Sequence, residues 1–183
     1  MKWMIASDIH GSAGFCREML AAWDREGAER LLLLGDILYH GPRNDLPREY
    51  APKQVIEMLN ARKDRIFSVR GNCEAEVDQM VLGFPVMADY CLLPAAGRLI
   101  IATHGHIYHE DNLPPMKSGD VLLYGHTHVL RAEKKNGYYF LNPGSVSLPK
   151  EGNPPSYAVL EEDTFIIRKL DGEMVTQIRL EDD

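Results

Sequence analysis

The sequence lacks long apolar segments and contains few cysteines. Its apolar runs are short, such as the one at residues 31–34, whereas a helix that crosses a bilayer needs about 20 apolar residues. The apolar stretch before Asp8 is likewise too short for the core of a signal peptide. Cys16, Cys73 and Cys91 are odd in number and show no CxxC spacing, which disfavours a disulfide framework or a thiolate zinc site. We therefore expect a cytoplasmic protein with reduced cysteines and no membrane partner.

The sequence also lacks an excess of positive charge. It contains 20 Lys and Arg residues against 27 Asp and Glu residues, for a formal net charge of −7. A protein that binds polymeric nucleic acid through its phosphates needs a basic surface, so we expect no such partner, although one phosphate group could still be bound locally. The length of 183 residues, with 45% hydrophobic and 26% charged residues, predicts a single globular domain over residues 1–183.

The apolar patterning differs between the two halves of the chain. In the first half, apolar strands at residues 2–7, 30–34 and 65–69 alternate with a helix marked by Phe15, Met19 and Trp23, and with a second helix that begins at Pro52. A short helix is expected at residues 73–82. The second half predicts further strands, at residues 86–93, 99–103, 121–124, 130–134, 138–141, 157–161, 164–170 and 174–180. Hairpin turns at residues 136–137 and 171–172 favour mostly antiparallel pairing there, within two packed sheets that carry helices outside.

Five predicted strands end in polar side chains beside a glycine. These ends read Asp8-Ile9-His10-Gly11, Gly35-Asp36, Gly71-Asn72, His104-Gly105-His106 and Gly125-His126-Thr127-His128. Because ligands bind at the carboxyl ends of strands in α/β sheets, we expect two Asp, one Asn and four His side chains to converge there. Nitrogen and oxygen donors without thiolate suit Mn, Fe, Co, Ni or Zn. Seven candidate ligands exceed the needs of one ion and indicate two, about 3.5–4 Å apart, which can promote in-line phosphoryl displacement.

Each motif alone also has an ordinary structural explanation. Asp8 could cap a helix, Asp36 could belong to a strand-end turn, and a lone His104 could simply be packed. The motif at residues 125–128 is harder to dismiss, because alternate residues of an extended segment point the same way. Five such motifs in one chain favour the metal site.

The order of these motifs resembles the calcineurin-like metallophosphoesterase superfamily over nearly the whole chain. The segments at residues 35–44 and 142–145 resemble its small, YfcE-type phosphodiesterase branch. The resemblance implies an α/β fold, a four-layer α/β/β/α sandwich of two mixed sheets with a dinuclear site along one rim. It also implies metal ligands at seven positions: Asp8, His10 and His128 for the first ion, Asn72, His104 and His126 for the second, and Asp36 as the bridge.

Cys73 departs from the pattern that the resemblance implies, because most members carry a proton-donating or phosphate-contacting histidine there. Two interpretations are open: a small thiol that packs under the following helix, or the loss of the usual general acid. His106 is a candidate replacement donor, and a solvated surface histidine is an equal alternative. Arg43 and Arg70 are open between phosphate contact and solvent exposure.

The combined expectation is a metal-dependent phosphodiesterase that hydrolyses a small phosphodiester, with a hydroxide between two divalent ions attacking phosphorus. Mn²⁺ is the first choice, and Fe, Ni, Co or Zn are compatible with the ligands. The alternative is a non-catalytic protein-interaction scaffold of the retromer-subunit type on the same fold. That scaffold lacks an aspartate at the bridging position, whereas this chain has Asp36. Whether the chain forms a homo-oligomer is left open.

Overall fold

The computed structural model describes residues 1–95 and 97–180. The helices in these ranges are α1 (Ala13–Glu26), α2 (Pro52–Asn60) and α3 (Glu76–Val81), with a 3-10 turn at Lys63–Arg65. The strands are β1 (Trp3–Ala6), β2 (Arg30–Leu33), β3 (Ile66–Ser68), β4 (Tyr90–Ala95), β5 (Arg98–Thr103), β6 (Val121–Leu123), β7 (Arg131–Lys135), β8 (Tyr138–Asn142), β9 (Ser156–Glu161), β10 (Thr164–Lys169) and β11 (Met174–Arg179).

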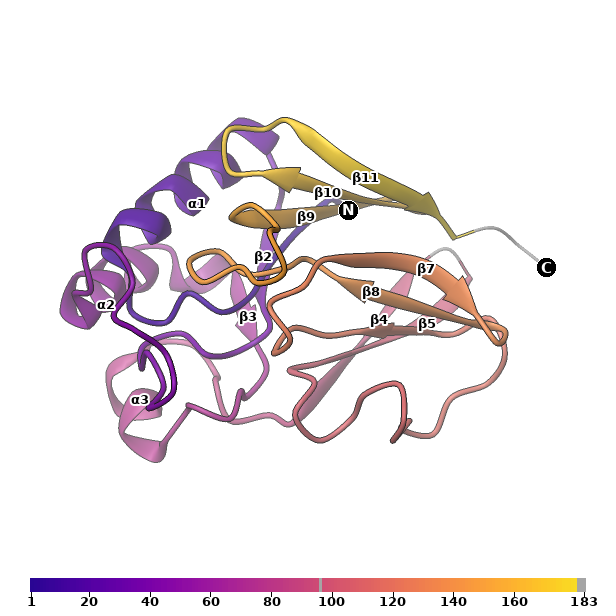
Figure 1. Ribbon diagram of the computed structural model, residues 1–183, viewed down its shortest axis with the longest axis horizontal. Helices are drawn as coiled ribbons and strands as arrows, with labels where there is room; N and C mark the ends of the chain where they lie inside the picture. Colours follow the sequence, from indigo (N-terminus) through magenta and orange to yellow (C-terminus); the bar gives the residue numbers. More distant parts are fainter. Residues whose placement is uncertain (96, 181–183) are drawn as a thin grey trace.

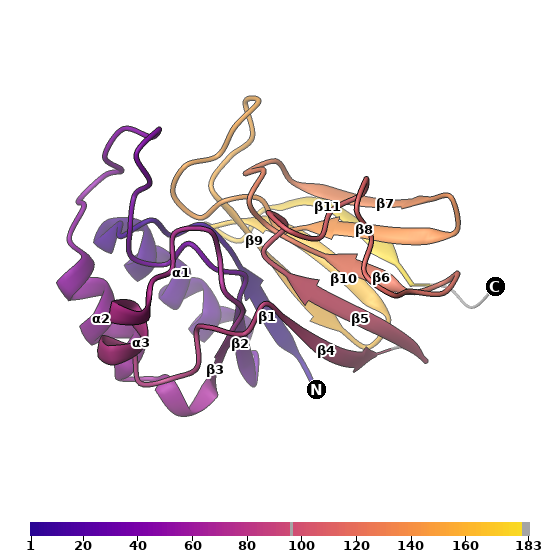
Figure 2. The same ribbon diagram turned by 90° about the horizontal axis from the view of Figure 1, so that it is seen from below.

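The strands form two mixed sheets that face each other (Figures 1 and 2). One sheet has six strands in the order β11-β10-β9-β1-β2-β3, and the other has five in the order β4-β5-β6-β8-β7. The C-terminal strands β9 to β11 thus join the sheet that the N-terminal strands begin. The two mixed sheets of the expected fold class are confirmed.

The short strands β1 and β2 are buried on both faces, which explains their continuous apolar sequence. Met4 and Leu31 pack in the core under α1 and α2. Ile5 and Leu32, one residue further along each strand, instead face the core between the two sheets, because side chains alternate across a strand.

The outer face of the five-stranded sheet is covered by an irregular segment. Leu113 and Met116 pack there on Leu122 and Phe140. Within the described residues this layer contains no helix, and the consecutive prolines at residues 114–115 explain why, since proline lacks the N–H that a helix interior requires. The helices of the structure lie on the other side, where α1 and α2 cover the six-stranded sheet (Figure 1).

The expectation of mostly antiparallel pairing in the second half was wrong for the centre of the five-stranded sheet. There β6 pairs in parallel with both β5 and β8. The sequence of an apolar strand does not show whether its neighbours run parallel or antiparallel to it. The hairpins at residues 136–137 and 171–172 do join β7 to β8 and β10 to β11. Two elements start three or more residues later than predicted, α3 at Glu76 and β4 at Tyr90. Before α3, residues 73–74 bond to the loop after β2 instead of to a helical turn.

Candidate metal centre

Five loops, which follow β1, β2, β3, β5 and β6, meet at the rim where the two sheets join. Within the first sheet, the Asp8 N–H donates to the carbonyl of Gly35 at 3.2 Å. Across the sheets, His104 Nδ1 donates to the carbonyl of Leu34 at 2.6 Å, and the His126 N–H donates to Asp8 Oδ2 at 3.2 Å. These bonds bring the strand ends together, and with them the side chains that the sequence predicted as ligands.

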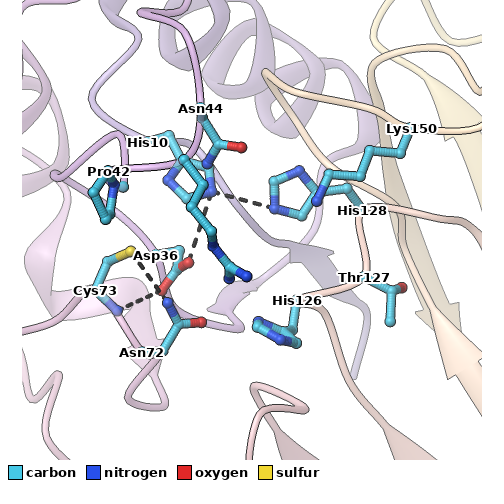
Figure 3. A pocket seen from close by; sticks show the side chains of 12 residues that line it. His10, Asp36, Pro42, Asn44, Asn72, Cys73, His126, Thr127, His128 and Lys150 are labelled. Carbon is cyan, nitrogen blue, oxygen red and sulfur yellow. Dashed lines mark hydrogen bonds and ion pairs between the residues drawn. The ribbon is translucent and has the colours of Figure 1, made fainter.

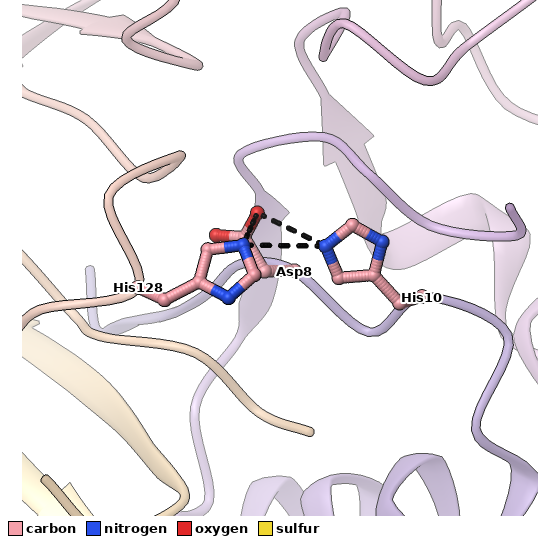
Figure 4. Close-up of side chains that lie close together, drawn as sticks. All are labelled: Asp8, His10 and His128. Atoms are coloured by element: carbon pink, nitrogen blue, oxygen red, sulfur yellow. Dashed lines mark hydrogen bonds and ion pairs between the residues drawn. The ribbon is translucent and has the colours of Figure 1, made fainter. Parts of the chain in front are cut away.

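Asp8, His10 and His128 form one cluster, which we call the first ligand group (Figure 4). His10 Nε2 lies 3.3 Å from His128 Nε2. Asp8 Oδ1 lies 3.6 Å from the first of these nitrogens and 3.2 Å from the second. The three residues are only 0%, 1% and 3% exposed, respectively. The group is therefore closed to solvent on nearly every side.

Asn72, His104 and His126 form the second ligand group. His104 Nε2 lies 3.1 Å from Asn72 Oδ1 and 3.2 Å from His126 Nδ1. His104 is fully buried, whereas His126 is half-buried and Asn72 is exposed. This group therefore opens to solvent.

Asp36 lies between the two groups and faces each with a different oxygen. Its Oδ2 is 3.7 Å from His10 Nε2, and its Oδ1 is 3.5 Å from His104 Nε2. The Cys73 N–H donates to Oδ1 at 2.9 Å and holds the carboxylate in place. A carboxylate in this position can contribute one oxygen to each group.

The hydrogen bonds of the histidines fit a metal site. His10, His104 and His128 each place Nδ1 against a backbone carbonyl, those of Tyr39, Leu34 and Leu148, at 2.8, 2.6 and 2.6 Å. A carbonyl only accepts, so Nδ1 carries the proton and the neutral ring presents the lone pair of Nε2 inward. Asp8 Oδ1 is buried and accepts no hydrogen bond from the described residues. The lone pairs of these nitrogen and oxygen atoms therefore point toward one another, and a divalent cation bound between them would accept them.

The carboxylates keep their charge although they are buried. Burial opposes ionisation of Asp8, but His10 and His128 outweigh it and hold the pKa of Asp8 well below its usual value. Burial likewise opposes protonation of His104, but the hydrogen bond to Asp36 outweighs it and raises the pKa of His104 to about 9. Protons on such histidines balance the carboxylates when no cation does, and a cation that binds there displaces them.

The backbone is strained at five of the seven predicted ligands. The φ angles are positive at Asp8, His10, Asp36, His126 and His128, at 59°, 50°, 53°, 63° and 61°. Residues with a Cβ rarely adopt this left-handed region, and such strain concentrates at functional sites. The tight turns aim these side chains at one another.

Glu74 is a site residue that the sequence analysis missed. Its carboxylate accepts the N–H groups of Asp36, Ile37 and Gly71 at 2.9, 2.7 and 2.5 Å. Burial, together with the nearby charge of Asp36, raises its pKa. Glu74 therefore ties the loop of the bridging aspartate to the loop of Asn72. Its place two residues after Asn72 was the only indication in the sequence.

A cavity of about 480 Å³ opens over the two ligand groups (Figure 3). Cys73 lines it and lies beside Asn72, whose Nδ2 is 3.4 Å from the sulfur. Burial and the charge of Asp36 raise the pKa of the thiol far above its usual value. Cys73 is therefore a neutral thiol at the cavity wall, and a poor acid.

The remaining candidates fall at different distances from the cavity. Arg43 lines it, whereas Arg70 pairs with Asp89 at 3.8 Å outside the lining. His106 is half-buried beside the second ligand group, with its ring centroid 5.4 Å from that of His104. Its Nδ1 is buried and has no hydrogen-bond partner among the described residues.

Comparison with known proteins agrees with this geometry. Residues 1–164 match the calcineurin-like phosphoesterase superfamily domain. The phosphodiesterase YfcE of Escherichia coli K12 is 45% identical over 181 residues, covering 98% of each chain. The probable metallophosphoesterase YsnB of Bacillus subtilis is 33% identical over 116 residues, covering 56% of this chain and 62% of its own.

Solved structures show the same relationship. The structure of the phosphoesterase YfcE from E. coli superposes with a TM-score of 0.96 at 44% identity, covering 99% of this chain and 100% of its own. The Zn²⁺ complex of Vps29 from Entamoeba histolytica, at 20% identity and a TM-score of 0.63 with coverage of 99% and 100%, shares the fold alone. The chain belongs to the calcineurin-like phosphoesterase superfamily.

Proposed function

We propose that this protein is a phosphodiesterase that uses two divalent metal ions, with Mn²⁺ as the first choice. The ions would be held by the first and second ligand groups and joined by Asp36. When bound, such ions neutralise phosphoryl charge and lower the pKa of a water molecule toward neutrality, which supplies hydroxide for in-line attack.

The observation that carries the proposal is the position of Asp36. Its Oδ2 faces His10 and its Oδ1 faces His104, at 3.7 and 3.5 Å. A site for a single ion does not require a carboxylate that faces two separate clusters of ligand atoms, so this arrangement favours two ions. The identity to the phosphodiesterase YfcE, over 98% of both chains, supports the same reaction.

The chain's own residues would bind and orient the substrate. Asn72 and His126 leave the second ligand group open to the cavity, where the phosphoryl group can enter. The cavity volume of about 480 Å³ suits a small diester. Within the described residues, no helix has the length and apolar character to cross a bilayer.

The test is an activity matrix of metals against substrates. Protein treated with chelator is passed through a desalting column, reconstituted with Mn²⁺, Fe²⁺, Co²⁺, Ni²⁺ or Zn²⁺, and assayed on bis(p-nitrophenyl) phosphate and on p-nitrophenyl phosphate. We expect hydrolysis of the diester, restored best by Mn²⁺. A stripped preparation, free of metal by elemental analysis, that retains its full rate would contradict the metal requirement. Hydrolysis of the monoester alone would contradict the diesterase assignment.

A further inference from the structure

Two cationic side chains at the mouth of the cavity have no acidic partner. Arg43 and Lys150 both line the cavity and are both exposed. Among the described residues, neither forms an ion pair, unlike Arg48, which pairs with Glu18. The chain as a whole has a net charge of −7, so unpaired cations gathered at one opening favour an anionic ligand there.

The two cations belong to loops with defined positions. The Lys150 N–H donates to the carbonyl of His128 at 3.1 Å, so the loop of Lys150 is attached to the first ligand group. Figure 3 shows Lys150 on the His128 side of the cavity, with Pro42 on the opposite side beside Cys73. The turn that carries Pro42 and Arg43 is held by Asn44, whose Nδ2 donates to the carbonyl of His40 at 2.8 Å.

One diester phosphate does not require these two charges. A phosphodiester carries a single negative charge, and on the proposed function its free oxygens would be matched by the cations that the two ligand groups would hold. Arg43 and Lys150 therefore offer charge to a different part of the substrate. A guanidinium and an ammonium together recognise a phosphate or a carboxylate.

We propose that the preferred substrates are phosphodiesters that carry a second anionic group, a phosphate or a carboxylate, on one ester arm, and that Arg43 and Lys150 bind this group. The proposal rests on the phosphodiesterase function above and specifies its substrate class. Arg43 contacts the group from the turn at residues 41–44, and Lys150 from the loop behind His128. Both residues determine specificity and take no part in the transfer itself.

The experiment compares three nitrophenyl diesters on the Mn²⁺-loaded protein: thymidine 5′-(p-nitrophenyl phosphate), the same compound with a 3′-phosphate, and the same compound with a 3′-carboxymethyl group. The readout is the ratio of kcat/KM between an anionic and the uncharged arm. We expect a ratio of about ten or more, mostly because KM is lower for the anionic substrate, since hydrogen bonds between charged groups are stronger than those between neutral groups. The ratio should fall as ionic strength rises. The two anionic arms show whether phosphate or carboxylate is preferred.

The variants Arg43→Gln and Lys150→Gln should each reduce this ratio, and the double variant should bring it to about one. Lys53→Gln, which removes an exposed charge on α2, is the matched control and should leave the ratio unchanged. Binding of thymidine 3′,5′-bisphosphate and thymidine 5′-monophosphate, followed by calorimetry, should show the same preference without turnover.

Hydrolysis of all three diesters with a ratio near one in the wild type would overturn this inference and leave the phosphodiesterase function intact. A ratio that Arg43→Gln and Lys150→Gln do not change would also overturn it. If none of the diesters, nor bis(p-nitrophenyl) phosphate, is hydrolysed by metal-loaded protein, the proposed function itself fails.

Discussion

The two ligand groups contain similar side chains in very different surroundings. In the first, all three residues are almost completely buried. In the second, only His104 is buried, while His126 is half-buried and Asn72 is exposed. On the proposed function, we therefore expect the first group to retain an ion, and the second to exchange an ion and admit a substrate.

Strand position explains the difference between Asp8 and Asn72. Asp8 follows β1, which lies between β9 and β2, whereas Asn72 follows β3 at the edge of the same sheet. The carbonyl of Asp8 also accepts the hydroxyls of Ser145 and Ser147, both at 3.0 Å. Strands on both sides bury Asp8, while the edge position leaves Asn72 open.

Complete removal of metal should have the largest effect. We expect diester hydrolysis to fall to the rate of buffer alone, because both groups would lose the cations that we propose they bind. Stepwise return of Mn²⁺, followed by calorimetry and elemental analysis, should show two binding steps, the tighter one at the first ligand group. His10→Ala should weaken the tighter step and Asn72→Ala the weaker one, without abolishing either. Two Mn²⁺ binding steps of equal affinity in the wild type would contradict the expected difference between the two ligand groups.

Asp36→Asn should have the next largest effect. The amide lacks the negative charge that would offset the repulsion between the two cations, so one ion should leave. Activity should then fall by more than about 100-fold, because loss of a group that only orients metal ligands already lowers metal affinity or activity about 10–100-fold. Asn72→Ala is the reference for loss of an outer ligand and should cost less. Two ions retained at full activity in Asp36→Asn would remove Asp36 from the bridging role.

Glu74→Gln should affect the second group more than the first. The amide nitrogen cannot accept a hydrogen bond, so at least one of the three backbone N–H groups loses its partner, at a cost of about 1–3 kcal/mol in the free energy of unfolding. Metal affinity at the second group and activity should fall about tenfold, while the tighter step of the Mn²⁺ titration stays. Glu76→Gln, an exposed acid on α3, is the matched control. Equal loss of both steps would show that Glu74 supports the whole rim.

Cys73→His should have the smallest effect on activated substrates. A neutral, poorly acidic thiol gives the leaving alkoxide little assistance, so the wild type should strongly prefer nitrophenyl esters. A histidine should raise rates on alkyl esters a few-fold, below the roughly 10²–10⁴-fold of a positioned general acid, because the turn at Gly41 limits its placement. A Cβ on that glycine would lie 3.6 Å from the Cys73 sulfur.

The measurement for Cys73→His is a plot of log rate against leaving-group pKa for both proteins, with metal content determined in each. A shallow wild-type slope that the substitution does not change would show that another residue already donates the proton. His106, half-buried beside the second ligand group, would be the first residue to substitute.

The strands and the residues at their ends were readable from the sequence. Apolar runs followed by glycine and a polar side chain predicted where β1, β2, β3, β5 and β6 end, and residues of this kind gather wherever parallel strands end at one rim. The hairpin at Asn136-Gly137 was equally local, because its turn requires the positive φ that both residues adopt. Local chemistry was sufficient for these features.

Other features depend on contacts between distant parts of the chain. The pairing of β9 with β1 joins residues far apart in sequence, and the parallel pairing of β6 with β8 has no local signature. The role of Glu74 appears only when the loops after β2 and β3 lie side by side. The left-handed backbone at His126 and His128 persists because packing outweighs its local cost. The sequence alone therefore determined the residue types of the site. The difference in burial between Asp8 and Asn72 was decided by the sheet, which places β1 inside and β3 at its edge.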